Sequence, residues 1–181
     1  TLIMILELLK RITKSLENKK IPYMLSGSMA LNNYTIPRMT LDIDFVIELH
    51  EENLNDFLAI FNENYYLNTN TVKEEIKQLG MFNVIDHETG FKVDFILRKN
   101  TEYHKLEFER KQRAKIADFE VWIVAPEDLT ISKIEWIQQY QSDKQVSDIQ
   151  NLIANPEIDK EYIRTWCNKL KLNTFNLIDN A

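Results

Sequence analysis

Two aspartates that lie two residues apart give this chain its clearest chemical signal. Asp42 and Asp44 occur in the short β-branched and aromatic segment 41–47, which predicts a strand. Residues i and i+2 of a strand point to one face, so we expect both carboxylates on one side and Ile43 on the other. Adjacent carboxylates repel each other, and a hard divalent cation such as Mg²⁺ relieves that repulsion. Standing alone, the pattern would describe two solvated residues on the open face of an edge strand.

The pair Gly27-Ser28 adds a feature that favours phosphate binding. The chain has only three glycines in 181 residues, and this one separates the apolar run 21–25 from the helix-like segment 28–33. Glycine lets a backbone approach a phosphate closely, and Ser28 would place a hydroxyl at a helix N-terminus, where anions are favoured. The alternative is an ordinary strand-to-helix turn with Ser28 as N-cap, and both interpretations can hold together.

A third carboxylate, Asp94, lies in a second predicted strand, 91–97. Its neighbours Val93 and Phe95 would face the core, which leaves Asp94 on the opposite face. We expect segment 81–85 to pair with this strand through a loop of turn-forming residues. If strands 41–47 and 91–97 are neighbours, three carboxylates face one cleft.

The order of these motifs resembles the signature of the DNA-polymerase-β-type nucleotidyltransferase superfamily. Residues ahead of the aspartate pair and in the last third resemble its AbiEii-like branch, which includes toxins of toxin–antitoxin pairs. The matching regions span about residues 21–153. The motifs that carry the resemblance are, in chain order, Gly27-Ser28, Arg38-x-Thr40-x-Asp42-x-Asp44, Asp94, the segment 125–133 with Lys133, and Asp148-Ile149.

The resemblance implies an α/β (α+β) fold, with a mixed nucleotidyltransferase-type sheet flanked by helices. It implies a nucleotidyltransferase core over 1–124 and a helical portion over 125–181 packed on that core. It also implies Mg²⁺-dependent transfer of a nucleoside monophosphate from a nucleoside triphosphate to a hydroxyl acceptor. Asp42 and Asp44 would hold the Mg²⁺ that carries the triphosphate, and Asp94 would join Asp42 or Asp44 at a second Mg²⁺ and help to activate the acceptor hydroxyl.

Other matched residues would bind the nucleotide. Gly27 and Ser28 would cradle the β- and γ-phosphates, and Lys133 would reach the triphosphate or the leaving pyrophosphate. Lys133 could instead be a helix-surface lysine whose stem covers the core. Arg38 could contact phosphate, or could pair with Asp42 or Glu48 as a structural support. Asp148 could orient Lys133 or simply lie in the first turn of its helix.

The sequence leaves the acceptor and the partners open. A tRNA or other RNA 3′ end, a protein hydroxyl and a small antibiotic-like alcohol all fit, and the AbiEii-like resemblance raises the possibility of an antitoxin partner. Two other functions stay open. One is a non-catalytic module of the same fold that binds a nucleotide or a partner protein, and the other is a phosphodiesterase that uses the same aspartates with water as acceptor.

Composition excludes several other classes. A net charge of −6 argues against a generally basic protein that coats nucleic acid. The single cysteine, Cys167, permits no internal disulfide and indicates a reducing compartment, with the thiol in the core. No apolar run reaches about 18 residues, so we expect a cytoplasmic protein without a membrane span. The chain lacks zinc-type His/Cys clusters, the P-loop, the dinucleotide glycine pattern and a serine nucleophile elbow.

The remaining elements follow from periodicity and capping. Basic residues gather in segment 98–115, which fits a solvated helix or a positive lip for a phosphate, with Tyr103 and Phe108 as core or cover residues. Ser142 and Gln145 fit a capping box. Elements are expected over 2–20 (helix), from 51 (helix), 72–79 (helix), 113–124 (two short strands), from Pro126 (helix), from Ser142 (helix), 162–170 (helix) and 175–178 (short helix).

Overall fold

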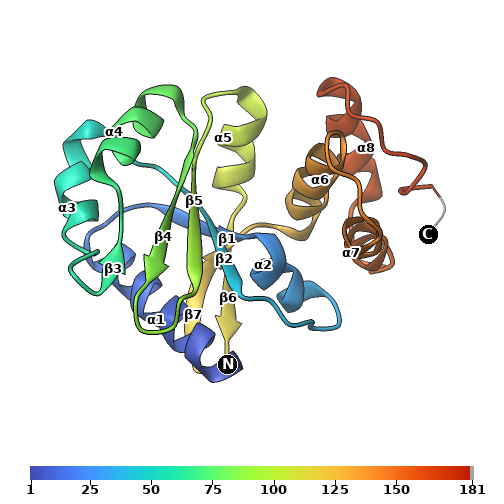
Figure 1. Cartoon of the computed structure of the whole chain (residues 1–181). Coiled ribbons are helices and arrows are strands. Elements are labelled where there is room, and N and C mark those ends of the chain that lie inside the picture. Colours follow the sequence, from blue (N-terminus) through green and yellow to red (C-terminus); the bar gives the residue numbers. More distant parts are fainter. Residues whose placement is uncertain (180–181) are drawn as a thin grey trace.

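A seven-stranded mixed sheet forms the framework of the molecule (Figure 1). The computed structural model describes residues 1–179. Along the sheet the strand order is β3-β4-β5-β2-β1-β7-β6, and the pairs β2–β5 and β1–β7 are parallel while the other four are antiparallel. The strands are β1 (Tyr23–Ser26), β2 (Asp42–Ile47), β3 (Tyr65–Tyr66), β4 (Met81–Asp86), β5 (Lys92–Leu97), β6 (Gln112–Ile116) and β7 (Phe119–Ile123).

Helices cover the sheet and extend the molecule beyond one end of it. Helices α6, α7 and α8 form a group beside the sheet, at the right of Figure 1, where α6 and α7 pack against α2. The helices are α1 (Leu2–Asn18), α2 (Gly27–Tyr34), the 3-10 turn η1 (Glu51–Asn53), α3 (Leu54–Leu58), α4 (Thr69–Gln78), α5 (Glu102–Glu109), α6 (Pro126–Ile137), α7 (Asp143–Ile153) and α8 (Lys160–Lys169). This mixed sheet with flanking helices confirms the predicted α/β class.

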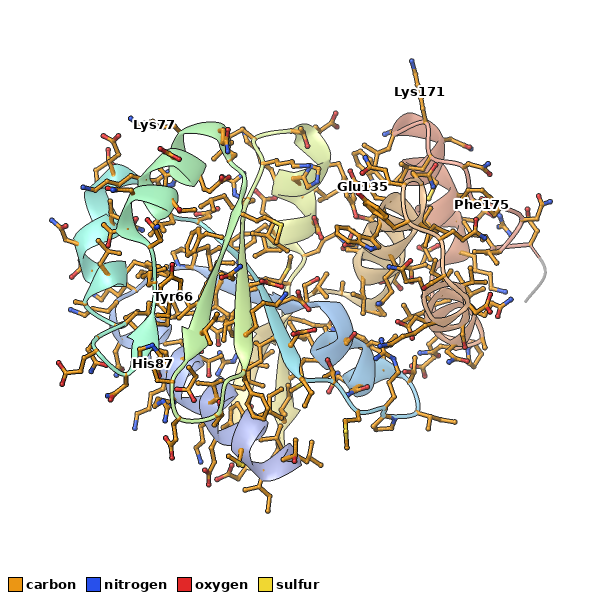
Figure 2. All side chains as sticks on the ribbon, viewed as in Figure 1. Tyr66, Lys77, His87, Glu135, Lys171 and Phe175 are labelled. Carbon is orange, nitrogen blue, oxygen red and sulfur yellow. The ribbon has the colours of Figure 1, made fainter. Side chains whose placement is uncertain are left out.

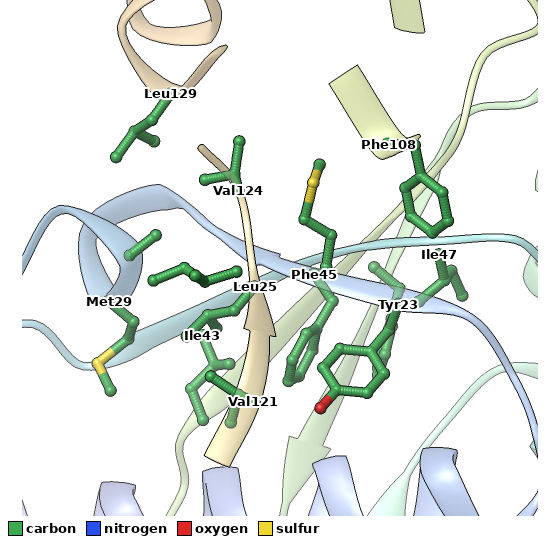
Figure 3. Close-up of a cluster of buried hydrophobic side chains, with 14 of the residues drawn as sticks. Tyr23, Leu25, Met29, Ile43, Phe45, Ile47, Phe108, Val121, Val124 and Leu129 are labelled. Carbon is green, nitrogen blue, oxygen red and sulfur yellow. The ribbon is translucent and has the colours of Figure 1, made fainter. Parts of the chain in front are cut away.

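The aromatic part of the core lies on the sheet face opposite the predicted carboxylates. Strand β2 buries every second residue, so Ile43, Phe45 and Ile47 are inside while Asp42 is exposed. Phe45 stacks on Phe95 of β5 with ring centroids 5.5 Å apart. Figure 3 shows part of this cluster around Phe45. Each such ring contributes about 1.5–3 kcal/mol through burial, so the alternation fixes which face of β2 is polar.

Several predicted boundaries need correction. The first helix ends at Asn18, not at residue 20, because Lys20 has a φ of +55° and turns the chain toward β1. The helix predicted from residue 51 is short, consisting of η1 and α3. The short helix predicted over 175–178 is wrong. Phe175 and Asn176 have φ values of +50° and +57°, which a right-handed helix cannot contain, and Figure 2 shows Phe175 on the outer side of the α6–α8 group.

Other predictions are confirmed. Two strands, β6 and β7, occur where segment 113–124 predicted them, and the edge strand β3 was not predicted. Of the predicted capping box, only the Ser142 half is formed: its hydroxyl accepts a hydrogen bond from the backbone N–H of Gln145, whereas the Gln145 side chain binds Trp136 and Tyr140. Cys167 is buried, and burial raises the pKa of its thiol to about 11. Within residues 1–179, every helix is too short or too polar to cross a bilayer.

Candidate active site

Three neighbouring strands place polar side chains in one row on the face away from the core. Ser26 at the end of β1 lies opposite Asp44 of β2, and Asp44 lies opposite Asp94 of β5 in the parallel pair. The predicted adjacency of the two aspartate-bearing strands is therefore confirmed. Asp42 shares this face of β2 but lies at its exposed end, opposite Lys92.

Gly27 brings the backbone of the β1–α2 turn against the carboxylate of Asp44. Its φ is +61°, a conformation that glycine adopts without strain, and a Cβ there would lie 2.0 Å from Asp44 Oδ2. Helix α2 starts at Gly27, and its N-cap is Ser26. The alternative of Ser28 as N-cap is therefore wrong. Ser28 is the second helical residue, and its hydroxyl oxygen accepts a hydrogen bond of 2.8 Å from Arg38 Nη2.

The carboxylate row is electrostatically strained. Burial raises the pKa of Asp44 to about 6, and the charges of Asp94 and Asp42 add to this effect. Lys92 and Lys133 act in the opposite direction but do not cancel it. A carboxylate in this situation gains from any cation that approaches it.

The two carboxylate oxygens of Asp94 have different surroundings. Lys92 Nζ lies 2.9 Å from its Oδ2, whereas Oδ1 is buried and has no hydrogen-bond partner within residues 1–179. A buried carboxylate oxygen without a partner lowers the stability of the fold. Such an oxygen is a suitable ligand for a hard cation such as Mg²⁺.

The carboxylates are nevertheless not gathered into a finished metal site. In the described part of the chain, no three His, Cys, Asp or Glu side chains are grouped so that they could hold a metal ion. The donor chemistry fits Mg²⁺, while the expected grouping of Asp42, Asp44 and Asp94 is not formed with Lys92 bound to Asp94.

A buried carboxylate on α7 gathers the cations of the site. Arg38 donates to Asp148 through Nε (3.1 Å to Oδ1) and Nη2 (2.8 Å to Oδ2), and Lys133 Nζ donates to Oδ2 at 3.0 Å. Burial alone would raise the pKa of Asp148, but the hydrogen bonds and charges of Arg38 and Lys133 outweigh it and lower that pKa.

These contacts decide between two sets of alternatives. Asp148 contacts Lys133, as one interpretation required, and it is well past the first turn of α7, so the other interpretation is wrong. The expected pairing of Arg38 with Asp42 or Glu48 is also wrong, because Arg38 binds Asp148 and Glu48 binds Arg98 at 2.8 Å.

One cleft joins the polar row of the sheet to the cations of the helices. It has a volume of about 480 Å³ and lies between the sheet and the helices α2, α6 and α7. Six of the predicted site residues line it, whereas Asp42 does not. The six are Gly27, Ser28, Arg38, Asp44, Asp94 and Lys133.

The cleft also contains residues that the sequence did not single out. Lys92, Trp136 and Lys144 line it. The sequence spacing could have predicted Lys92 as a cleft residue, because it precedes Asp94 by two residues and must share its strand face. Lys144 likewise precedes Asp148 by one helical turn.

The cations of segment 98–115 lie outside this cleft, and Tyr103 and Phe108 of that segment are buried. This favours the helix interpretation of the segment over the positive lip.

Alignment with solved structures shows that this chain has the nucleotidyltransferase fold. Antibiotic-resistance factor ANT(2'')-Ia, solved in solution, aligns with a TM-score of 0.62 and 11% identity, over 93% of this chain and 92% of that chain. The same factor in complex with adenylyl-2''-tobramycin aligns with a TM-score of 0.57 and 13% identity, over 91% and 95%.

A third solved structure agrees. TM1012 of Thermotoga maritima, provisionally assigned as a nucleotidyltransferase, aligns with a TM-score of 0.54 and 17% identity, over 92% of this chain and 94% of that chain. No protein-family model and no curated protein matches the chain by sequence. At these identities the likeness establishes the fold alone.

Proposed function

We propose that this protein is a Mg²⁺-dependent nucleotidyltransferase that moves a nucleoside monophosphate from a nucleoside triphosphate to a hydroxyl acceptor. One observation carries the proposal. Gly27-Ser28, the opposed pair Asp44 and Asp94, and Lys133 come from distant parts of the chain and line one cleft in a nucleotidyltransferase fold.

The residues at the polar row fit a divalent ion. Asp44, with its raised pKa, and Asp42 at the open end would hold the Mg²⁺ that carries the triphosphate, and the unpartnered oxygen of Asp94 would bind a second Mg²⁺. Lys92 is half-exposed and a lysine side chain has several rotatable bonds, so it could leave Asp94 when a divalent ion arrives. When bound, Mg²⁺ would neutralise phosphate charge and polarise the phosphoryl group.

The other residues act on the triphosphate. Gly27 permits close approach at the start of α2, where Ser28 and the helix N-terminus favour anions. Lys133, oriented by Asp148, would balance the charge of the leaving pyrophosphate. The acceptor oxygen forms a bond to the α-phosphorus while the bond from that phosphorus to the bridging oxygen of pyrophosphate breaks. Asp94 would receive the proton of the acceptor hydroxyl.

The acceptor and the branch of the superfamily remain part of the proposal. ANT(2'')-Ia is described in complex with adenylyl-2''-tobramycin, which supports a small hydroxylated acceptor. An RNA 3′ end such as that of tRNA or a protein hydroxyl fits the same chemistry. The AbiEii-like motifs support a toxin-type protein with an antitoxin partner in the cytoplasm. We also propose that the core and the helical portion divide between residues 124 and 125.

A second candidate is a module of the same fold that binds nucleotide without transfer. The ion pair between Lys92 and Asp94 favours it, because a lysine fixed there would exclude a divalent ion from Asp94. A phosphodiesterase would need water in place of the acceptor. Transfer and hydrolysis give different products from the same nucleotide, and a binding module gives none.

The deciding experiment uses α-labelled nucleoside triphosphates, each tested with and without Mg²⁺. The purified chain is incubated in parallel with total RNA, with an aminoglycoside mixture and with a cell lysate. Transfer predicts label in an acceptor and release of pyrophosphate, and both must require Mg²⁺. Free labelled monophosphate without labelled acceptor would indicate hydrolysis. Tight nucleotide binding without either product would leave the binding module.

A further inference from the structure

An exposed aromatic pair lies at the mouth of the cleft. Trp136, near the end of α6, and Tyr140, just after it, have 56% and 65% of their surface exposed, and their ring centroids are 5.8 Å apart. Trp136 lines the cleft together with Asp44, Asp94 and Lys133. Single exposed aromatic residues are ordinary, but a pair at the edge of a candidate site presents a continuous apolar surface where a substrate would enter.

The indole of Trp136 is held in place by the next helix. In the amide orientation that satisfies both groups, Gln145 of α7 accepts a hydrogen bond of 2.6 Å from Trp136 Nε1 and donates to the backbone carbonyl of Tyr140. The polar atom of the indole is therefore used, and its exposed surface is hydrocarbon ring. A ring that is already oriented loses little conformational entropy when a ligand stacks on it.

The position along α6 indicates what the ring would meet. Trp136 follows Lys133 by three residues, so their side chains are neighbours on the helix surface, with Cβ atoms about 5–6 Å apart. If Lys133 binds phosphate, a group joined to that phosphate through a ribose comes within reach of the indole. Lys144, also exposed on the cleft, adds a cation beside the ring.

We propose, resting on the nucleotidyltransferase function above, that Trp136 is a stacking platform for a nucleobase and that Tyr140 supports it from the side. Every base has a π-face, so such a platform accepts all bases with small differences in affinity. The base belongs either to the incoming triphosphate or to the end of an RNA acceptor. The chemistry of recognition is the same in both cases.

The test separates the base from the phosphates. Trp136→Ala and Trp136→Phe are compared with the wild type by calorimetry against two Mg²⁺-loaded probes, a nucleoside triphosphate and inorganic tripolyphosphate. Tyr66→Ala is the matched control, because Tyr66 is 54% exposed and lies on β3, across the sheet from α6 (Figure 2). Thermal melts check that each variant is folded.

The platform predicts a selective loss. Trp136→Ala should lower the affinity for the nucleoside triphosphate by about 10-fold, equivalent to about 1.4 kcal/mol, and should leave the affinity for tripolyphosphate unchanged. Trp136→Phe should retain most of the affinity, and Tyr66→Ala should have no effect. If triphosphate affinity is unchanged but the KM for a short single-stranded RNA acceptor rises about 10-fold in Trp136→Ala only, the base is that of the acceptor.

Two results would overturn the platform. Equal losses for the nucleotide and for tripolyphosphate would mean that Trp136 acts on the phosphates or on the fold. Unchanged binding of triphosphate and RNA would mean that the pair serves another purpose, and the transfer function would then stand on its own evidence. If the wild type binds neither probe, the proposed transferase function is contradicted. If RNA also leaves the tryptophan fluorescence of the wild type unchanged, the proposed base platform is contradicted as well.

Discussion

Gly27 and Asp44 approach each other so closely that no side chain fits between them. A Cβ on Gly27 would lie 2.0 Å from Asp44 Oδ2 and 2.6 Å from its carboxyl carbon. The φ of +61° adds a second, independent requirement for glycine. The turn that would cradle phosphate therefore also sets the position of the central carboxylate.

This contact predicts the effect of Gly27→Ala. The backbone strain costs about 1–2 kcal/mol, and the clash displaces the Asp44 side chain from the cleft. We expect a lower free energy of unfolding and loss of Mg²⁺-dependent triphosphate binding by at least about 10-fold. Urea unfolding and calorimetry measure the two effects.

Gly90→Ala is the matched control. Gly90 has a φ of +72°, and a Cβ there would meet nothing within 4 Å. The control should therefore show the backbone cost alone and bind nucleotide normally. Equal behaviour of the two variants would mean that the contact with Asp44 is unimportant for binding.

Asp44→Asn should stabilise the metal-free protein and abolish Mg²⁺-dependent triphosphate binding. Ionised Asp44 is half-buried near Asp94 and Asp42; its partial burial and their charges raise its pKa and make its charge unfavourable at neutral pH. Removing that charge should add on the order of 1–3 kcal/mol to the free energy of unfolding at pH 8. Asp143→Asn, at an exposed site on α7, is the control. A variant that melts lower and still binds Mg²⁺-triphosphate normally would make Asp44 a structural residue.

Asp94→Ala separates chemistry from binding. Asp94 is proposed to act on the acceptor, so the variant should keep near-wild-type affinity for Mg²⁺-triphosphate and lose transfer of labelled nucleotide by at least about 100-fold. Single-turnover transfer and calorimetry supply the two measurements. Parallel loss of affinity and rate would place Asp94 at the first metal, and unchanged transfer would remove it from the site.

Glu107 gives the stability a pH dependence that does not involve the cleft. It is buried on α5, and burial, with the charges of Asp128 and Glu135, raises its pKa to about 8. Figure 2 shows Glu135 between α5 and α6. Below about pH 4.5 both the folded and unfolded states hold the proton. From there to about pH 8 only the folded state holds it, so stability falls as pH rises.

Glu107→Gln should remove this part of the slope. The difference in free energy of unfolding between variant and wild type should move in favour of the variant by up to about 1.4 kcal/mol per pH unit between pH 5 and 8. Urea titrations at four pH values measure it. A constant difference across that range would show that Glu107 is already ionised in the folded protein at pH 5.

The sequence predicted the carboxylate row because its causes are local. Strand alternation fixes the faces of Asp44 and Asp94, and apolar neighbours fix which face is buried. The ion pair between Arg38 and Asp148 joins residues 110 positions apart, and it depends on how α7 packs against α2. No local pattern specifies such a contact. The resemblance supplied Arg38 and Asp148, but only the packing joined them.

The sequence also could not predict which partner each charged side chain takes. The alternation of β5 places Lys92 beside Asp94, but only the coordinates show the ammonium on one of the carboxylate oxygens. At the C-terminal end, the apolar residues of 175–178 predicted a helix, although two consecutive left-handed residues exclude it. The sequence pattern indicates which residues can come into contact, and the backbone geometry determines whether they do.

The division of the cleft between sheet and helices has a consequence for the growing chain. The ribosome makes Asp44 and Asp94 before Lys133 and Asp148, and at about 5–20 residues per second the interval from Asp94 to Asp148 is roughly 3–10 s. During that time the chain has Arg38, Asp44, Lys92 and Asp94 but lacks Lys133 and Asp148, which α6 and α7 contribute to the cleft. Competence for nucleotide binding therefore arrives only after α6 and α7 have been made, because these helices carry Lys133 and Asp148.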